Sequence, residues 1–339
     1  MAVSKPGLRA SWAIAIIPVI QTGGCFASDG VRRARVERAQ ARRGRRFRIA
    51  ACLLLAAGLP LAAPSAHAAP SAHAAPSAHA APVKVAVNPL GNALDQGYRD
   101  LYNLDFAGAH AQFAAWMQAH PADPLGAASD AAAYLFGEFD RLSIIDVELF
   151  ADQSRFDHRG KRTSDPTVRK AFEDRSDQAN QLADAALARN PKDANALYAK
   201  TLVCGMRSNY ALMIDKRDVA ALSFSKQASA LARQALAIDP AMYDAYLASG
   251  VENYMLSLKF APLRWVLSLT GAGTDRAEGI RLLRVTASQG HYLAPFARMM
   301  LAVVAIRDGH PQQARDTLTS LAKEFPGNSL YIRQRDRIR

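Results

Sequence analysis

The chain has 339 residues, half of them hydrophobic but only 8% aromatic, and its many alanines favour helix because alanine loses no side-chain entropy there. The formal net charge is +12, yet residues 1–48 contain eleven Lys or Arg against two acidic residues, which leaves only +3 for the remainder. A surface that binds nucleic acid carries its positive charge on the folded part. This distribution therefore argues against a nucleic-acid role.

The first 82 residues have the order of segments expected of an export leader. Arg42–Arg48 is strongly basic, and Ile49–Leu61 is an apolar stretch too short to span a bilayer comfortably. Small-x-small cleavage sites follow, beginning with Ala66-His67-Ala68. This order predicts a signal peptide over residues 42–68 and an exported protein, periplasmic or secreted. The alternative is a signal anchor that stays uncleaved, which would supply a membrane contact.

Residues 1–41 precede the basic segment, although an export signal normally begins close to its basic residues. Two interpretations follow. In the first, translation starts downstream of Met1 at a codon other than Met. In the second, Trp12–Ile20 is the apolar region of the signal and Cys25 lies in a poor lipobox.

A hexapeptide, Ala-Pro-Ser-Ala-His-Ala, occurs three times in tandem between residues 63 and 80. Its evenly spaced histidines are not expected to bind metal, because a Pro/Ala tract is extended and this one lacks other ligands. Residues 63–82 are predicted to be a flexible linker. Cys204 is the only cysteine after the signal, so no disulfide is expected, and the residue is read as a small core side chain with a reactive thiol as the alternative.

A repeated frame of alanine and proline runs through the rest of the chain. Four prolines each follow an alanine by twelve residues, in the pairs Ala109–Pro121, Ala179–Pro191, Ala228–Pro240 and Ala314–Pro326. The pattern resembles the second half of the tetratricopeptide repeat, where a small residue lets two helices approach and a proline ends the second helix. Arg233–Pro240 is the clearest match. Gly97 and Gly250 stand at the position where the two helices of a repeat cross.

The resemblance implies an all-α fold over residues 83–339. The expected architecture is a right-handed superhelical solenoid of helix-turn-helix repeats with about 10–12 helices. Two departures from the frame predict insertions near residues 153–166, read as a polar loop, and 259–274. Ala277 is the predicted alanine of the repeat that the second insertion interrupts.

The same resemblance implies a concave groove lined by the first helix of each repeat. Projection of the family's groove positions gives a largely apolar set, without the Lys, Asn and Arg that clamp a charged peptide terminus. The candidate groove residues chosen from this set are Tyr198, Leu202, Met206, Leu247, Val251, Tyr254, Met255, Phe296, Met299 and Val303. The first interpretation is a non-catalytic scaffold that binds a protein or peptide partner there. The alternative is a carrier of an apolar small molecule or lipid. An apolar groove needs a cover, and Ala261–Leu269 is a candidate segment of the chain itself.

Residues capable of chemistry are few. The sequence contains no Gly-rich phosphate loop, no paired cysteines and no His-x-x-x-His helix, so no cofactor or metal is expected. Glu138, Asp140 and Glu252 are acidic residues on otherwise apolar helices. As buried carboxylates they would be general acids of an enzyme, which is a further alternative, or partners of arginines such as Arg141 or Arg298.

Overall fold

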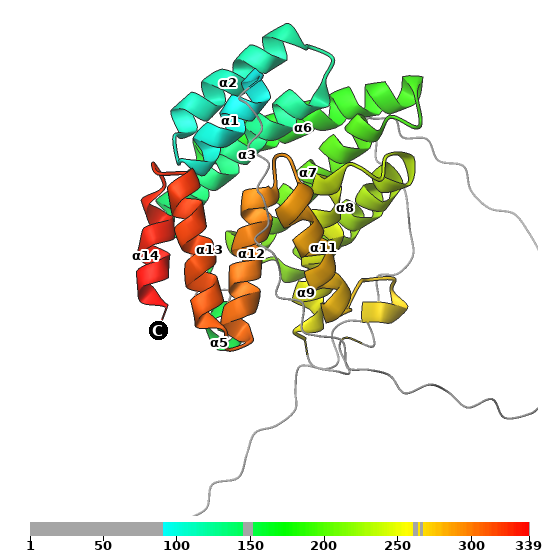
Figure 1. Ribbon diagram of the computed structural model, residues 1–339. Helices are drawn as coiled ribbons and strands as arrows, with labels where there is room; N and C mark the ends of the chain where they lie inside the picture. The colour runs from blue at the N-terminus through cyan, green and yellow to red at the C-terminus, as the bar shows by residue number, and fades with distance from the viewer. Residues whose placement is uncertain (1–90, 145–151, 260–263, 265–266, 339) are drawn as a thin grey trace, which may run out of the picture. The chain divides into compact units, whose positions relative to one another are not determined.

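The computed structural model describes residues 91–144, 152–259, 264 and 267–338 (Figure 1). The chain divides into two units, residues 1–75 and 76–339, and all described residues belong to the second. These residues form α-helices and one 3-10 turn and contain no strand, which confirms the all-α prediction. None of the described helices is long and apolar enough to cross a membrane. The predicted leader of residues 1–82, with its signal peptide and linker, lies outside the described residues.

Twelve α-helices are found in the described part of the chain. They are α1 (Ala93–Tyr102), α2 (Phe106–Ala119), α3 (Pro124–Arg141), α5 (Gln153–Asp157), α6 (Pro166–Arg189), α7 (Ala194–Met213), α8 (Asp218–Ile238), α9 (Tyr246–Ser257), α11 (Arg276–Gln289), α12 (Ala294–Arg307), α13 (Pro311–Glu324) and α14 (Ser329–Arg337), with the 3-10 turn η1 (Tyr243–Ala245) before α9.

Polar side chains and prolines set where these helices begin and end. Asp and Asn side chains accept backbone N–H groups of the first turn and so satisfy donors that have no intrahelical partner. They are Asn92, Asp105, Asp123, Asp165, Asp193, Asp275 and Asn328. The four repeated prolines each lie two residues beyond the end of a helix, after α2, α6, α8 and α13. The sequence prediction that they close helices is confirmed.

Small residues stand where neighbouring helices come closest. The four repeated alanines, Ala109, Ala179, Ala228 and Ala314, are all buried. A Cβ on Gly97 would lie 2.4 Å from the Phe113 ring of α2. The prediction that Ala277 lies at such a contact is wrong, because Ala277 is exposed. The close contact between α11 and α9 is at Gly279, where a Cβ would lie 2.5 Å from the backbone nitrogen of Tyr254.

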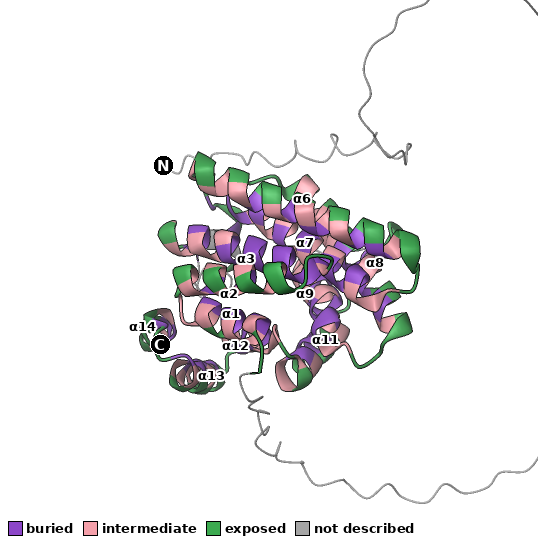
Figure 2. Ribbon diagram, turned by 90° about the horizontal axis from the view of Figure 1, so that it is seen from above, coloured by how far each residue is buried: buried purple, intermediate pink, exposed green. Residues whose placement is uncertain are grey.

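Each helix packs mainly on its neighbours in the chain. The pairs α1–α2, α2–α3, α7–α8, α9–α11, α11–α12, α12–α13 and α13–α14 are all in contact, while α3 packs on both α6 and α7. Figure 2 shows that α3 and α7 are largely buried, whereas α6 carries an exposed outer face. Within residues 91–338, α3 and α7 are thus among the most buried helices, and α1, α2, α6 and α8 pack on them.

The first helix also meets the last ones. Tyr102 Oη donates to the carbonyl of Tyr292 at 2.9 Å, and Asn328 Nδ2 donates to the carbonyl of Tyr102 at 2.9 Å. His291 Nε2 lies 2.6 Å from Asp95 Oδ1. Figure 1 accordingly shows α1 close to the start of α12 and to the α13–α14 pair. Residues nearly two hundred positions apart in the chain are therefore joined by direct hydrogen bonds.

The two predicted insertions differ from the expectation in one respect. Gln153–Asp157 forms the short helix α5, where the sequence predicts a polar loop. The reason is that Phe156 and Arg159 are buried: the guanidinium of Arg159 lies over the Phe156 ring, pairs with Asp218, and donates to the carbonyl of Leu212 at 3.1 Å. The second insertion separates α9 from α11, and most of its Ala261–Leu269 segment lies outside the described residues.

Candidate binding cavity

A cavity of about 200 Å³ lies between α1, α3, α7, α8, α9 and α12. Its lining is almost entirely apolar. The aromatic rings of Phe136 on α3 and Phe296 on α12 both contribute to it and contact each other edge to face, with centroids 6.1 Å apart. Helices from both ends of the described region therefore build one wall together.

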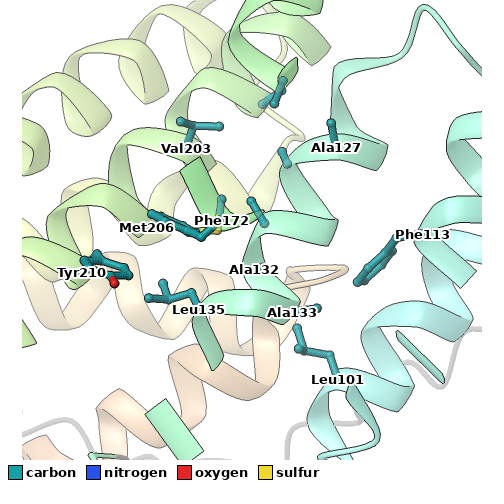
Figure 3. Close-up of a cluster of buried hydrophobic side chains, with 14 of the residues drawn as sticks. Leu101, Phe113, Ala127, Ala132, Ala133, Leu135, Phe172, Val203, Met206 and Tyr210 are labelled. Carbon is teal, nitrogen blue, oxygen red and sulfur yellow. The ribbon is translucent and has the colours of Figure 1, made fainter. Parts of the chain in front are cut away.

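Buried packing holds the helices around this cavity. Figure 3 shows part of the main hydrophobic cluster, in which Ala132 and Leu135 of α3 lie near Met206 and Tyr210 of α7. Alanines on α3 allow the helix axes to come close, and the larger side chains of α7 fill the space between them. Ala132 and Met206 belong both to this cluster and to the cavity lining, so the wall is part of the core.

Nine of the ten residues predicted from the sequence to face a groove line this cavity. They are Tyr198, Leu202 and Met206 on α7, Leu247, Val251 and Met255 on α9, and Phe296, Met299 and Val303 on α12. Tyr254 does not line it. Leu247, Val251 and Met255 are spaced by four and form one stripe of α9, whereas Tyr254 continues the stripe of Gly250, which packs against α11.

Helices α1 and α3 supply lining residues that the sequence prediction missed. They include Tyr98, Leu101 and Tyr102 on α1 and Ala128, Ala132, Phe136 and Phe139 on α3. The α3 residues recur at spacings of three and four, which is the signal that one face of this helix points to a common surface. The repeat frame did not reveal it, because no anchor alanine occurs between Ala109 and Ala179.

One part of the lining is polar. Asp244 caps the start of α12 by accepting the backbone N–H groups of Tyr292 and Leu293 at 2.9 and 3.1 Å, and burial raises the pKa of its carboxyl. Tyr98 stacks on Tyr292 with centroids 4.4 Å apart. The hydroxyl of Tyr98 accepts a hydrogen bond from Ser129 at 3.1 Å.

The acidic residues considered as general acids lie elsewhere. Glu138 pairs with Arg141, as predicted, through two hydrogen bonds of 2.7 Å, but the pair lies within α3 and does not join two repeats. Asp140 is half-buried on α3, and Glu252 is buried between α8 and α9. Arg298, the other proposed partner, pairs with Glu324 instead. None of the three carboxylates lines the cavity.

Burial raises the pKa of Glu252, and the contacts of its carboxyl with Ser229 and with the backbone of Gly273 oppose the rise without cancelling it. Cys204 is a free, half-buried thiol whose pKa is also raised by burial. A raised thiol pKa disfavours the reactive thiolate.

The described residues contain no group of three or more His, Cys, Asp or Glu side chains placed to hold a metal ion. The candidate site is therefore the largely apolar cavity that includes Asp244 and the neighbouring tyrosines in its lining. Comparison of the chain with protein-family models, with curated proteins and with solved structures finds no match.

Proposed function

We propose that this chain is an exported, non-catalytic helical-repeat protein that holds a small apolar molecule in its central cavity. The observation that carries the proposal is the cavity itself, which measures about 200 Å³, lies between six helices and presents a mostly apolar surface. Ligand sites are typically concave, mostly apolar and preformed. Protein interiors are usually packed without voids of this size, so an unfilled space among packed helices is a candidate ligand site.

The repeat architecture is part of the proposal. The buried alanines, the prolines that follow four helices and the packing of each helix on its chain neighbours support an assignment to the tetratricopeptide type, wound as a right-handed superhelix. Export rests on the basic, apolar and small-residue segments between Arg42 and Ala68.

The size of the cavity favours a small molecule over a peptide. It is somewhat larger than the roughly 150 Å³ apolar cavity known to take benzene. A docked helix is about 10 Å across and needs a groove that is open along its length. Here the hydrogen bonds of Tyr102 and His291 hold α1 against the turn between α11 and α12. A protein or peptide partner in the same place is the alternative.

Filling the cavity tests the proposal. Gly205 on α7 lines it, and a Cβ added there would have nothing within 4 Å. We expect Gly205→Phe to occupy the space and Gly205→Ala, the matched control, to leave it open. Toluene should raise the melting temperature of the wild type and of Gly205→Ala by mass action, and should have little effect on Gly205→Phe.

Mass spectrometry of gently purified protein completes this test. We expect a bound apolar molecule in the wild type and in Gly205→Ala but not in Gly205→Phe. If the wild type carries no such molecule and does not respond to toluene, the carrier proposal fails. Loss of a cross-linked peptide partner in Gly205→Phe, in the absence of any small ligand, would establish the alternative.

A further inference from the structure

Three of the hydroxyl groups that line the cavity have a hydrogen-bond partner, whereas the hydroxyl of Tyr198 has none among the described residues. The hydroxyls of Thr201, Ser208 and Tyr102 each donate to a backbone carbonyl at 2.8–2.9 Å. Tyr198 also lines the cavity and is only 4% exposed, yet its hydroxyl has no hydrogen-bond partner among the residues that the structure describes. A buried hydroxyl without a partner costs free energy, and such groups in native proteins usually have a reason.

Two other polar side chains line the cavity together with Tyr198 and act on its hydroxyl electrostatically. Burial raises the pKa of Tyr198, and the neighbouring charge of Asp244 and the phenol of Tyr98 raise it further. Tyr98, Tyr198 and Asp244 all line the cavity. We call these three residues the polar corner. The rest of the lining surface is mostly apolar, although Thr201, Ser208, Asn209 and Ser225 also belong to the lining. The cavity therefore offers the polar corner to a polar group and its apolar surface to hydrocarbon.

The polar corner distinguishes between classes of polar group. A hydroxyl can accept a hydrogen bond from Tyr198 and donate one to a free lone pair of Asp244. A carboxylate can accept from the tyrosines, but its charge would be repelled by Asp244 in a region of low dielectric. A hydrocarbon without any polar group would leave Tyr198 unpartnered.

We propose that the ligand is an apolar molecule with one neutral hydroxyl group, and that this hydroxyl binds at the polar corner. The inference rests on the proposed carrier function and adds the chemistry of the ligand's head. In the empty cavity the Tyr198 oxygen is closed to a water-sized molecule. Binding therefore includes a small adjustment of side chains, which is common when sites fill.

Three molecules with the same carbon skeleton test the inference: toluene, benzyl alcohol and benzoate, titrated calorimetrically into the purified chain at pH 8. The diagnostic variant is Tyr198→Phe, whose lost hydroxyl has no partner to strand. We expect this variant to bind benzyl alcohol about three- to tenfold more weakly, as for one neutral hydrogen bond. Its affinity for toluene should stay within about twofold of the wild type, and benzoate should not bind the wild type.

Two further variants serve as controls. Tyr102→Phe removes a cavity hydroxyl that donates to a backbone carbonyl, so it should leave the ratio of benzyl alcohol to toluene affinity unchanged. Asp244→Asn should permit benzoate to bind. Equal weakening of toluene and benzyl alcohol by Tyr198→Phe, or benzoate binding to the wild type as tightly as the alcohol, would overturn the head-group inference alone. Failure of both neutral molecules to bind the wild type would overturn the carrier function itself.

Discussion

Two glutamates, each 2% exposed, lie in different environments in this molecule. Glu138 on α3 accepts two hydrogen bonds from Arg141 and one from the backbone N–H of Asp165 at 2.8 Å. Glu252 on α9 faces α8, and its Oε1 has no hydrogen-bond partner in the part of the chain that the structure describes.

The consequence is an opposite effect on protonation. Burial acts to raise the pKa of Glu138, but the hydrogen bonds from Arg141 and from the Asp165 backbone bring the pKa below its ordinary value. For Glu252 the effect of burial exceeds the effect of the surrounding hydrogen bonds and charges, so its pKa is above its ordinary value. The exposed fraction of the two residues is the same, but Glu252 lies deeper among protein atoms and has no arginine bound to it as Glu138 has, so burial and partners together decide which form of the carboxyl is favoured.

The same substitution at both sites should give opposite results, and the larger effect is expected at Glu138. Glu138→Gln removes the charge from two hydrogen bonds with Arg141 and weakens the contact that holds the start of α6 at Asp165. We expect a loss of about 2 kcal/mol in the free energy of unfolding at pH 7, which denaturant unfolding would measure. A loss of less than a few tenths of a kcal/mol would show that the ion pair contributes little.

Glu252→Gln should leave stability unchanged or raise it by about 1 kcal/mol at pH 7, because it removes a carboxyl whose ionisation in a buried place is unfavourable. The Gly205→Ala variant, measured in the same way, is the control: it shows how much a substitution that leaves the charge unchanged can raise the free energy of unfolding. A clear loss of stability in Glu252→Gln would mean that the ionised carboxylate has a stabilising partner.

The dependence on pH sharpens the comparison and is expected to be the smallest effect. In the folded state the pKa of Glu138 lies below its ordinary value of 4.5. The stability that this shift gives the folded protein is therefore present above pH 4.5 and is lost as the pH falls. The pKa of Glu252 lies above 4.5, so the stability that its protonated carboxyl gives the folded protein is present at lower pH and is lost as the pH rises. Unfolding curves of each Gln variant against the wild type from pH 4 to 8 should diverge in opposite directions.

Much of the local structure could be predicted from the sequence. Asp, Asn and Pro mark helix ends through short-range geometry, and the repeated alanines mark close helix contacts. The prediction failed at Ala277 because the backbone of α11 approaches Tyr254 too closely for any side chain, and only Gly279 permits this. Whether Ala277 or Gly279 contacts the neighbouring helix depends on the path of that helix, which the local sequence does not indicate.

The cavity was predictable only in part. The groove positions of α7, α9 and α12 follow from the repeat frame, and nine of the ten residues chosen there line the cavity. The contribution of α1 and α3 did not follow, since it depends on hydrogen bonds such as that from Tyr102 to Tyr292, far apart in the chain. That the Tyr198 hydroxyl has no partner among the described residues depends on all the neighbouring side chains at once, so no local pattern in the sequence indicates it.

The hydrogen bonds between α1 and the last helices have a consequence for how the chain folds. In an array whose units touch only their neighbours, folding can begin anywhere and the terminal units can open alone. Here Tyr102 and Asn328 must find each other across more than two hundred residues, a slow step because a long loop has to close first. Once it has closed, neither terminal helix can fray without breaking contacts at the opposite end of the described region.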